Sequence, residues 1–238
     1  MAVAIYAKNQ PPSAADQAKE ILKSDTGIYR TQKLAGDFLS FVEEVARISG
    51  RSLEKLQEAS NVLNVGALGV IIPTAVSSTI ELVQTTSDLA KKRFSCSLQE
   101  GLDFVQKISV SGQMIAYSAQ LFTQRHSFGV LGDMFSMVDD TVDVLSEGDQ
   151  LCELSSAQEK TLPKPARVYL DESRRLHCIK LAKAVFAVVV GIFGLLSLFP
   201  GGSLLPAVVL LGMSVASSAL ALIARVYQTN MTFILKPL

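Results

Sequence analysis

Residues 184–224 read AVFAVVVGIFGLLSLFPGGSLLPAVVLLGMSVASSALALIA, which is 41 residues without one ionisable side chain. The run is interrupted once, at Pro200, Gly201 and Gly202, where proline fixes φ and glycine admits positive φ, so a turn is expected. As helices, the arm before the turn is about 28 Å long and the arm after it about 31 Å. Both lengths match a hydrocarbon core of about 30 Å. The sequence therefore predicts a bilobed transmembrane hairpin over residues 180–226.

The energetics and the flanking charges agree with this prediction. Each arm gains roughly 3–6 kcal/mol on insertion, at about −0.3 to −0.6 kcal/mol per strongly apolar residue. Basic residues stand at the outer ends of the hairpin and none at its tip, which places both ends in the same cytosol-like compartment. The predicted topology residues are Arg174, Arg175, Lys180, Lys183 and Arg225. We therefore expect an integral membrane protein with both termini cytosolic.

Small residues recur at four-residue spacing inside the two arms. Ala187 with Gly191, and Gly212 with Ala216, would let the two helices approach closely in lipid. An alanine- and glycine-rich composition produces the same pairs by itself. A soluble alternative also exists for the whole hairpin, which amphipathic helices could enclose as in colicin-like pore-forming domains that insert later.

The composition of the whole chain narrows the functional classes. Of 238 residues, 49% are apolar and 18% are charged, with 22 basic and 22 acidic side chains. The low charged fraction favours a membrane protein or a very apolar globule. Zero net charge removes the main electrostatic reason to expect nucleic acid as a partner. Three scattered cysteines exclude a disulfide framework and a four-thiolate zinc site.

The remaining chain predicts an all-α architecture, a helical cytosolic domain followed by the C-terminal hairpin. We expect a flexible tail over residues 1–27, a helical domain over 28–154, a basic linker and juxtamembrane segment over 155–179, and a short tail over 227–238. An amphipathic helix is predicted from Tyr29 to Ile48, with Gly50 as its stop. Residues 59–80, bent around Pro73, and residues 108–124 are uncharged and favour buried core helices. Whether these two stretches enter the membrane stays open.

Residues 131–145 form a strongly amphipathic pattern with acids on one side. Asp139 and Asp143 share a helical face, and Asp140 lies close by. Such a face is usually solvated, and its functional interpretation is a docking surface for a basic partner. Hard cations need more oxygen ligands than these carboxylates offer, so no metal site is predicted.

No pattern in the chain points to catalysis. Phosphate loops, Rossmann glycines, zinc-helix and nucleophile-elbow motifs are all absent from the sequence. His177 and Cys178 are adjacent on a helix, where side chains point about 100° apart, so they make a poor dyad. Cys178 is a candidate for acylation, because thiols beside a membrane are accessible to lipid-modifying enzymes. We expect no enzyme activity and no cofactor.

The layout resembles that of the chlamydial inclusion membrane (Inc) proteins, in KLAKAVFAVVVGIFGLLSLF, the PGGS turn and LLPAVVLLGMSVASSALALIAR. The resemblance covers about a quarter of the chain and is one of hydropathy; many such proteins carry the hairpin early, whereas here it comes late. It implies export by a type III secretion system, insertion in a pathogen-containing vacuole membrane, and binding of host proteins. It implies no individual binding residue.

Two functions follow from these patterns. The first is a membrane-anchored, non-enzymatic interaction protein that presents its helical domain to an unidentified cytosolic protein, alone or as a homo-oligomer. The second is a pore-forming or membrane-remodelling protein with a buried hydrophobic hairpin. In both, the lipid bilayer is the first expected partner.

Overall fold

The computed structural model describes residues 3–7, 25–50, 54–91, 98–156, 163–199, 205–231 and 233–237. Apart from two short strands, these residues form helices, so the helical fold class is confirmed. The helices are α2 (Asp25–Ile48), α3 (Glu54–Lys91), α4 (Leu98–Thr123), α5 (His126–Ser156), α6 (Lys164–Leu196) and α7 (Ala207–Asn230).

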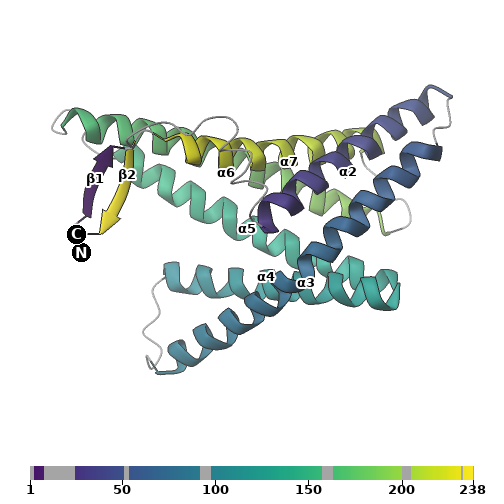
Figure 1. Ribbon diagram of the computed structural model, residues 1–238, viewed down its shortest axis with the longest axis horizontal. Coiled ribbons are helices and arrows are strands. Elements are labelled where there is room, and N and C mark those ends of the chain that lie inside the picture. The colour runs from purple at the N-terminus through teal and green to yellow at the C-terminus, as the bar shows by residue number, and fades with distance from the viewer. Residues whose placement is uncertain are drawn as a thin grey trace.

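The contacts between these helices close into a ring (Figure 1). Each helix packs against its neighbours in the chain, and α7 returns to pack against α2. The apolar pair α6–α7 therefore lies between α5 and α2, two helices that the sequence places in the domain before the hairpin. In this arrangement the hairpin shares long helix–helix contacts with the rest of the chain.

Two helix boundaries show how local sequence acts. The helix predicted from Tyr29 ends at Ile48 as expected, and Gly50 follows at φ +73°, a conformation that glycine adopts without strain. The segment predicted as basic linker and juxtamembrane, residues 155–179, includes the end of α5 and the first part of α6, which begins at Lys164. Pro163 is the N-cap of α6 and a second proline follows in its first turn, where a missing N–H costs least.

The two core helices predicted on either side of Pro73 are a single helix. Helix α3 runs as one helix of 38 residues through this proline. A proline in a helix interior removes one backbone hydrogen bond, which packing along the helix can offset. Here α3 packs against α2 and α4, and these contacts hold both sides of the proline in one helix.

The two ends of the chain meet in a short antiparallel ladder. Strand β1 (Val3–Ala7) pairs with β2 (Phe233–Pro237), with Val3 opposite Pro237. Part of the tail predicted as flexible is thus a strand beside α6. Five-residue strands whose partner lies at the other end of the chain leave no periodic signal in the sequence. The short polar helix candidate at residues 14–23 lies outside the described residues.

This protein encloses mostly small side chains and exposes many large apolar ones, unlike a water-soluble helical bundle. The most enclosed side chains are small or hydroxylated: Ala184 is 0% exposed, Ser111 1% and Ser109 2%. Large apolar side chains point outward on all six described helices, from Phe38 on α2 to Ile223 on α7. Water-soluble monomers rarely expose so much contiguous apolar surface, whereas helices packed in lipid use small and hydroxylated residues between them.

Serine hydroxyls join most of the helix pairs. Ser40 and Ser60 are 2.7 Å apart between α2 and α3. Between α3 and α4, Ser111 Oγ donates to the carbonyl of Ser78 at 3.0 Å. Between α6 and α7, Ser217 Oγ donates to the carbonyl of Lys183 at 3.1 Å. These bonds satisfy polar groups in the seams and leave the outer faces to apolar side chains.

Candidate functional site: the apolar hairpin and the groups that flank it

Helices α6 and α7 are long and apolar enough to cross a membrane, by length and composition. Only 6% of the most apolar window of α6, and 22% of that of α7, is buried inside the protein. A core helix of a water-soluble protein buries most of such a window. The rest of the described chain therefore does not enclose the hairpin.

The five basic residues predicted to orient the hairpin lie together at one end of it. They are Arg174, Arg175, Lys180 and Lys183 on α6, and Arg225 on α7. The bond from Ser217 to Lys183 fixes the antiparallel register of the two helices, so the end of α7 returns to the basic part of α6. The predicted turn at Pro200, Gly201 and Gly202 lies outside the described residues.

Lys183 binds two of the three carboxylates predicted as a partner surface. Its Nζ lies 2.9 Å from Asp140 Oδ1 and 3.0 Å from Asp143 Oδ2 on α5. The three side chains are 23%, 13% and 28% exposed, respectively, so the group is largely shielded from water. The acidic face of α5 thus neutralises the last charge before the apolar part of α6. A basic partner at this face would have to replace Lys183.

The next turn of the same seam holds a second charge group. His177 Nδ1 hydrogen-bonds Glu147 Oε2, and Lys180 Nζ lies 3.4 Å from Glu147 Oε1. Burial alone would raise the pKa of Glu147, but the bond with His177 and the charge of Lys180 outweigh it and hold the pKa below its ordinary value. We call Asp140, Asp143, Glu147, His177, Lys180 and Lys183 together the α5–α6 ion-pair cluster.

Asp139, the third predicted carboxylate, is in a different position. Its Oδ1 is buried without a hydrogen-bond partner. Burial, together with the neighbouring charges of Asp143 and Asp140, raises the pKa of Asp139 to about 6. Of the three carboxylates, Asp139 is therefore the one whose charge the fold disfavours.

Replacing Asp139 by asparagine is expected to stabilise the protein. Because the folded chain binds this proton at higher pH than the unfolded chain, the charge opposes folding above about pH 6 and ceases to do so as the pH falls toward 3.8. We expect Asp139→Asn to raise the free energy of unfolding by about 1–3 kcal/mol well above pH 6. The gain should shrink on acidification. Urea unfolding in detergent micelles across this pH range measures it, and a gain independent of pH would contradict the assignment.

The small residues predicted to pack the hairpin mostly face other helices. A Cβ on Gly191 would lie 3.2 Å from Met137 Cγ on α5, and one on Gly212 would lie 3.5 Å from the Phe41 ring on α2. Ala187 lines a cavity, and Ala216 is half-buried. The side chains nearest to the two glycines therefore belong to α5 and α2. Only at Gly191 would a Cβ be closer than ordinary contact, so this glycine favours the approach of α5. That the small residues bring α6 and α7 together stays a prediction.

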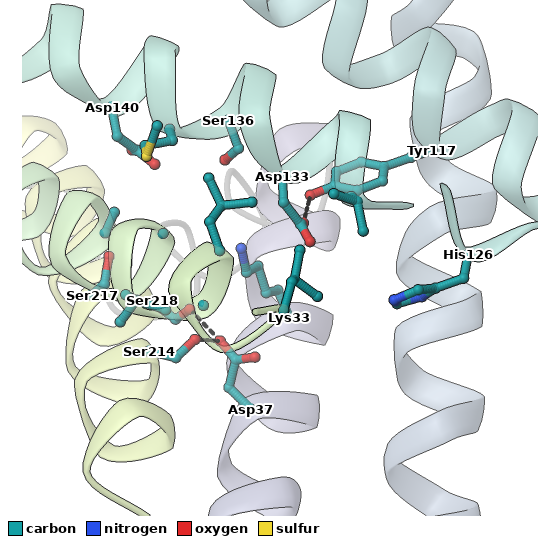
Figure 2. A pocket seen from close by; sticks show the side chains of 18 residues that line it. Lys33, Asp37, Tyr117, His126, Asp133, Ser136, Asp140, Ser214, Ser217 and Ser218 are labelled. Carbon is teal, nitrogen blue, oxygen red and sulfur yellow. Dashed lines mark hydrogen bonds between the residues drawn. The ribbon is translucent and has the colours of Figure 1, made fainter. Parts of the chain in front are cut away.

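A cavity of about 340 Å³ opens between α2, α4, α5, α6 and α7 (Figure 2). Asp37 on α2 accepts hydrogen bonds from Ser214 at 3.0 Å and Ser218 at 2.8 Å on α7. Asp133 on α5 accepts one from the Tyr117 hydroxyl on α4 at 2.6 Å. The wall that α6 contributes is apolar. The cavity thus combines two carboxylates that accept hydrogen bonds from hydroxyl groups with one apolar wall.

Sequence analysis missed Asp37 and its serines. Asp37 lies within the amphipathic helix predicted from Tyr29 to Ile48, and the serines lie within the second apolar arm of the predicted hairpin. Ser214, Ser217 and Ser218 are the hydroxyl groups of the second arm, residues 204–224, and their clustering was a usable signal. Hydroxyls gathered on one side of a spanning helix indicate a polar contact there.

Among the described residues, no group of three or more His, Cys, Asp or Glu side chains could hold a metal ion. His177 is bound to Glu147 on α5, and Cys178 is exposed. His126 stands apart from the carboxylates of the cavity (Figure 2).

The chain was compared with known proteins at three levels. No protein-family model, no curated protein and no solved structure matches it.

Proposed function

We propose that this chain is a membrane-anchored, non-enzymatic interaction protein whose hairpin α6–α7 spans a bilayer. The observation that carries the proposal is the exposure of the two apolar helices, whose windows are 6% and 22% buried. Left in water, this surface would drive aggregation, whereas acyl chains would cover it at a gain of roughly 3–6 kcal/mol per helix. Both termini would lie on the cytosol-like side, with the basic residues.

The pattern of polar groups supports the same conclusion. Near the hairpin, charged side chains pair with one another: Lys183 binds both Asp140 and Asp143. Ionisable groups beside lipid face the bundle interior and pair, because an unpaired charge in hydrocarbon is costly. Paired charges inside and apolar side chains outside are what a membrane-anchored bundle requires.

The helices before the hairpin would meet the protein partner. With Lys183 in place the acidic face of α5 is occupied, so we do not assign the partner surface to Asp140 and Asp143. The partner is a cytosolic protein or a further copy of this chain. Chemical crosslinking of the full chain in membranes, followed by solubilisation in mild detergent, separates these two outcomes by the mass of the product.

Alkaline carbonate extraction tests the anchor. The full chain should stay in the membrane pellet after carbonate and leave it in detergent, because only acyl-chain contacts resist high pH. Release by carbonate alone would overturn the proposal. Tags at each terminus, both digested by protease added on the cytosol-like side, would test the topology independently.

One observation favours a second candidate, a membrane-remodelling or pore-forming protein. Helix α2 lies along α7, and Asp37 binds Ser214 and Ser218 within the spanning segment. Crossing a bilayer requires that α2 either leaves α7 or carries Asp37 with it. A disulfide between cysteines at Phe41 and Gly212 would lock the two helices together. If the locked chain inserts only after the disulfide is reduced, insertion requires α2 to separate from α7. Leakage of dye from the vesicles on reduction would support membrane remodelling.

The likeness to inclusion membrane proteins extends the proposal to a pathogen-containing vacuole and a host partner. It rests on the bilobed hairpin and its glycine turn. Expression in a bacterium with a working type III secretion system, beside a secretion-deficient strain, tests it. Transfer of the full chain to the medium by the first strain alone would support the extension, and retention by both would remove it.

A further inference from the structure

The outer side of the α4–α5 pair carries two rows of exposed apolar side chains. Ile108, Ile115 and Phe122 on α4 are 38%, 53% and 75% exposed; Leu131, Met134 and Val138 on α5 are 42%, 49% and 40% exposed. Spacings of seven, and of three and four, keep each row on one side of its helix. The sequence predicted a core helix over residues 108–124, but in the structure Ile108, Ile115 and Phe122 point outward.

The two rows form one surface, which we call the outer face. Gly112, between Ile108 and Ile115, is so close to α5 that a Cβ there would come within 2.7 Å of the Phe135 ring. Phe135 itself lies between the residues of the α5 row. The ring therefore bridges the rows where the two helices meet. The face is continuous across the pair.

No charge interrupts the outer face along α4. Residues 108–124 contain no Asp, Glu, Lys, Arg or His over a length of about 25 Å as a helix. The carboxylates of α5 turn away from the face. Asp133 accepts from Tyr117 on α4, and Asp140 binds Lys183 on α6. These two carboxylates thus bind partners on other helices and are not members of the apolar row.

The outer face lies level with the first spanning segment. Met137 on α5 packs against Gly191 in the apolar part of α6, and Asp140 meets Lys183 at its start. Since α5 runs antiparallel to α6 between these contacts, the α5 row lies beside the apolar stretch that begins at Ala184. A bilayer that surrounds this stretch of α6 reaches the outer face without a break.

The other neighbour of the hairpin differs in this respect. The outward side of α2 also carries apolar side chains, with Phe38, Val45 and Ile48 53%, 42% and 64% exposed, but the Arg47 side chain is 71% exposed beside them. An exposed charge of this kind favours water. Of the two helices that flank the hairpin, α5 is the one that contains no Lys or Arg.

We propose that the outer face of α4–α5 is a second lipid-contacting surface, covered by the acyl chains of the bilayer that α6–α7 spans. This inference rests on the proposed function, because the register with α6 sets the depth of the face. The occupant is lipid rather than a second copy, because the face is continuous with the spanning helices and carries no charge along α4 to specify a protein partner.

Site-specific fluorescence tests the inference. Single cysteines at Ile115, Val138 and Ile192, and the native Cys152 alone, each with the other native cysteines replaced by serine, would carry an environment-sensitive nitrobenzoxadiazole label. The full chain would be reconstituted in vesicles of phosphatidylcholine and phosphatidylglycerol. Brominated lipid quenches labels in acyl chains, and iodide quenches labels in water. Ile192 reports the spanning helix. The exposed Cys152 reports the water side, because Leu154 beside it contacts Arg174 at the basic end of the hairpin.

We expect labels at Ile115 and Val138 to behave like the label at Ile192, quenched by brominated lipid and several-fold less accessible to iodide than the label at Cys152. If both match Cys152 while Ile192 stays in lipid, the inference is overturned and the anchor stands. If neither quencher reaches them, protein covers the face and the inference is again overturned. If iodide reaches Ile192, the anchor itself fails.

Discussion

Arginine in place of Ile192 is expected to release the protein from membranes. Ile192 lies near the middle of the first spanning segment and is 43% exposed. An arginine at the centre of a spanning helix costs about 2.5–3.5 kcal/mol, against a gain of roughly 3–6 kcal/mol for the whole arm. That cost shifts the insertion equilibrium by roughly two orders of magnitude. Carbonate extraction should find much of the variant in the supernatant.

A matched variant separates this effect from damage to the fold. Cys152 on α5 is exposed like Ile192, but it lies beyond the basic end of the hairpin, where Leu154 contacts Arg174. In water the two arginine substitutions would be equally mild, because exposed positions tolerate polar residues. In a membrane only Ile192→Arg should alter extraction. Equal behaviour of Ile192→Arg and Cys152→Arg would show that the hairpin remains in water.

The parts of this structure that the sequence predicted are those set by nearby residues. A run of 41 uncharged residues with one Pro-Gly-Gly interruption defines two apolar helices, and the glycine after Ile48 ends α2 where expected. Solvation and backbone freedom act over one or two helical turns, so the sequence alone shows them. Even so, the prolines near Pro163 suggested a linker, whereas Pro163 is the N-cap of α6.

The remaining features depend on contacts between distant parts of the chain. Asp37 and Ser218 are 181 positions apart, and Arg30 donates to the carbonyl of Ala221 across 191 positions. No periodicity links such residues. The sequence also did not show which way the apolar stripes of the amphipathic helices face, because such a stripe suits a protein core and lipid equally well. Only the packing shows that the stripes of α4 and α5 point outward.

Removal of the Lys183 charge is expected to destabilise the fold strongly. Lys183→Met would leave Asp140 and Asp143 close together without their cation, in a site where the three side chains are 13–28% exposed. Removing one partner of a buried ion pair costs about 3–5 kcal/mol, and the residual exposure here lowers our expectation to about 2–4 kcal/mol. Urea unfolding of the full chain in detergent micelles measures the loss. Arg175→Met, at an exposed position of the same helix, should change the free energy of unfolding by less than about 0.5 kcal/mol.

Neutralising the acids tests whether the pairing itself causes this loss. In the triple variant Lys183→Met, Asp140→Asn, Asp143→Asn no charge is left unpaired at this point, so most of the stability should return. The recovery is a coupling free energy between α5 and α6, since residues in one ion-pair group are not additive. A triple variant as unstable as Lys183→Met would instead assign the loss to the lysine stem. With recovery, the acidic side of α5 serves to hold that helix against the spanning segment, which is the contact that sets the depth of the outer face.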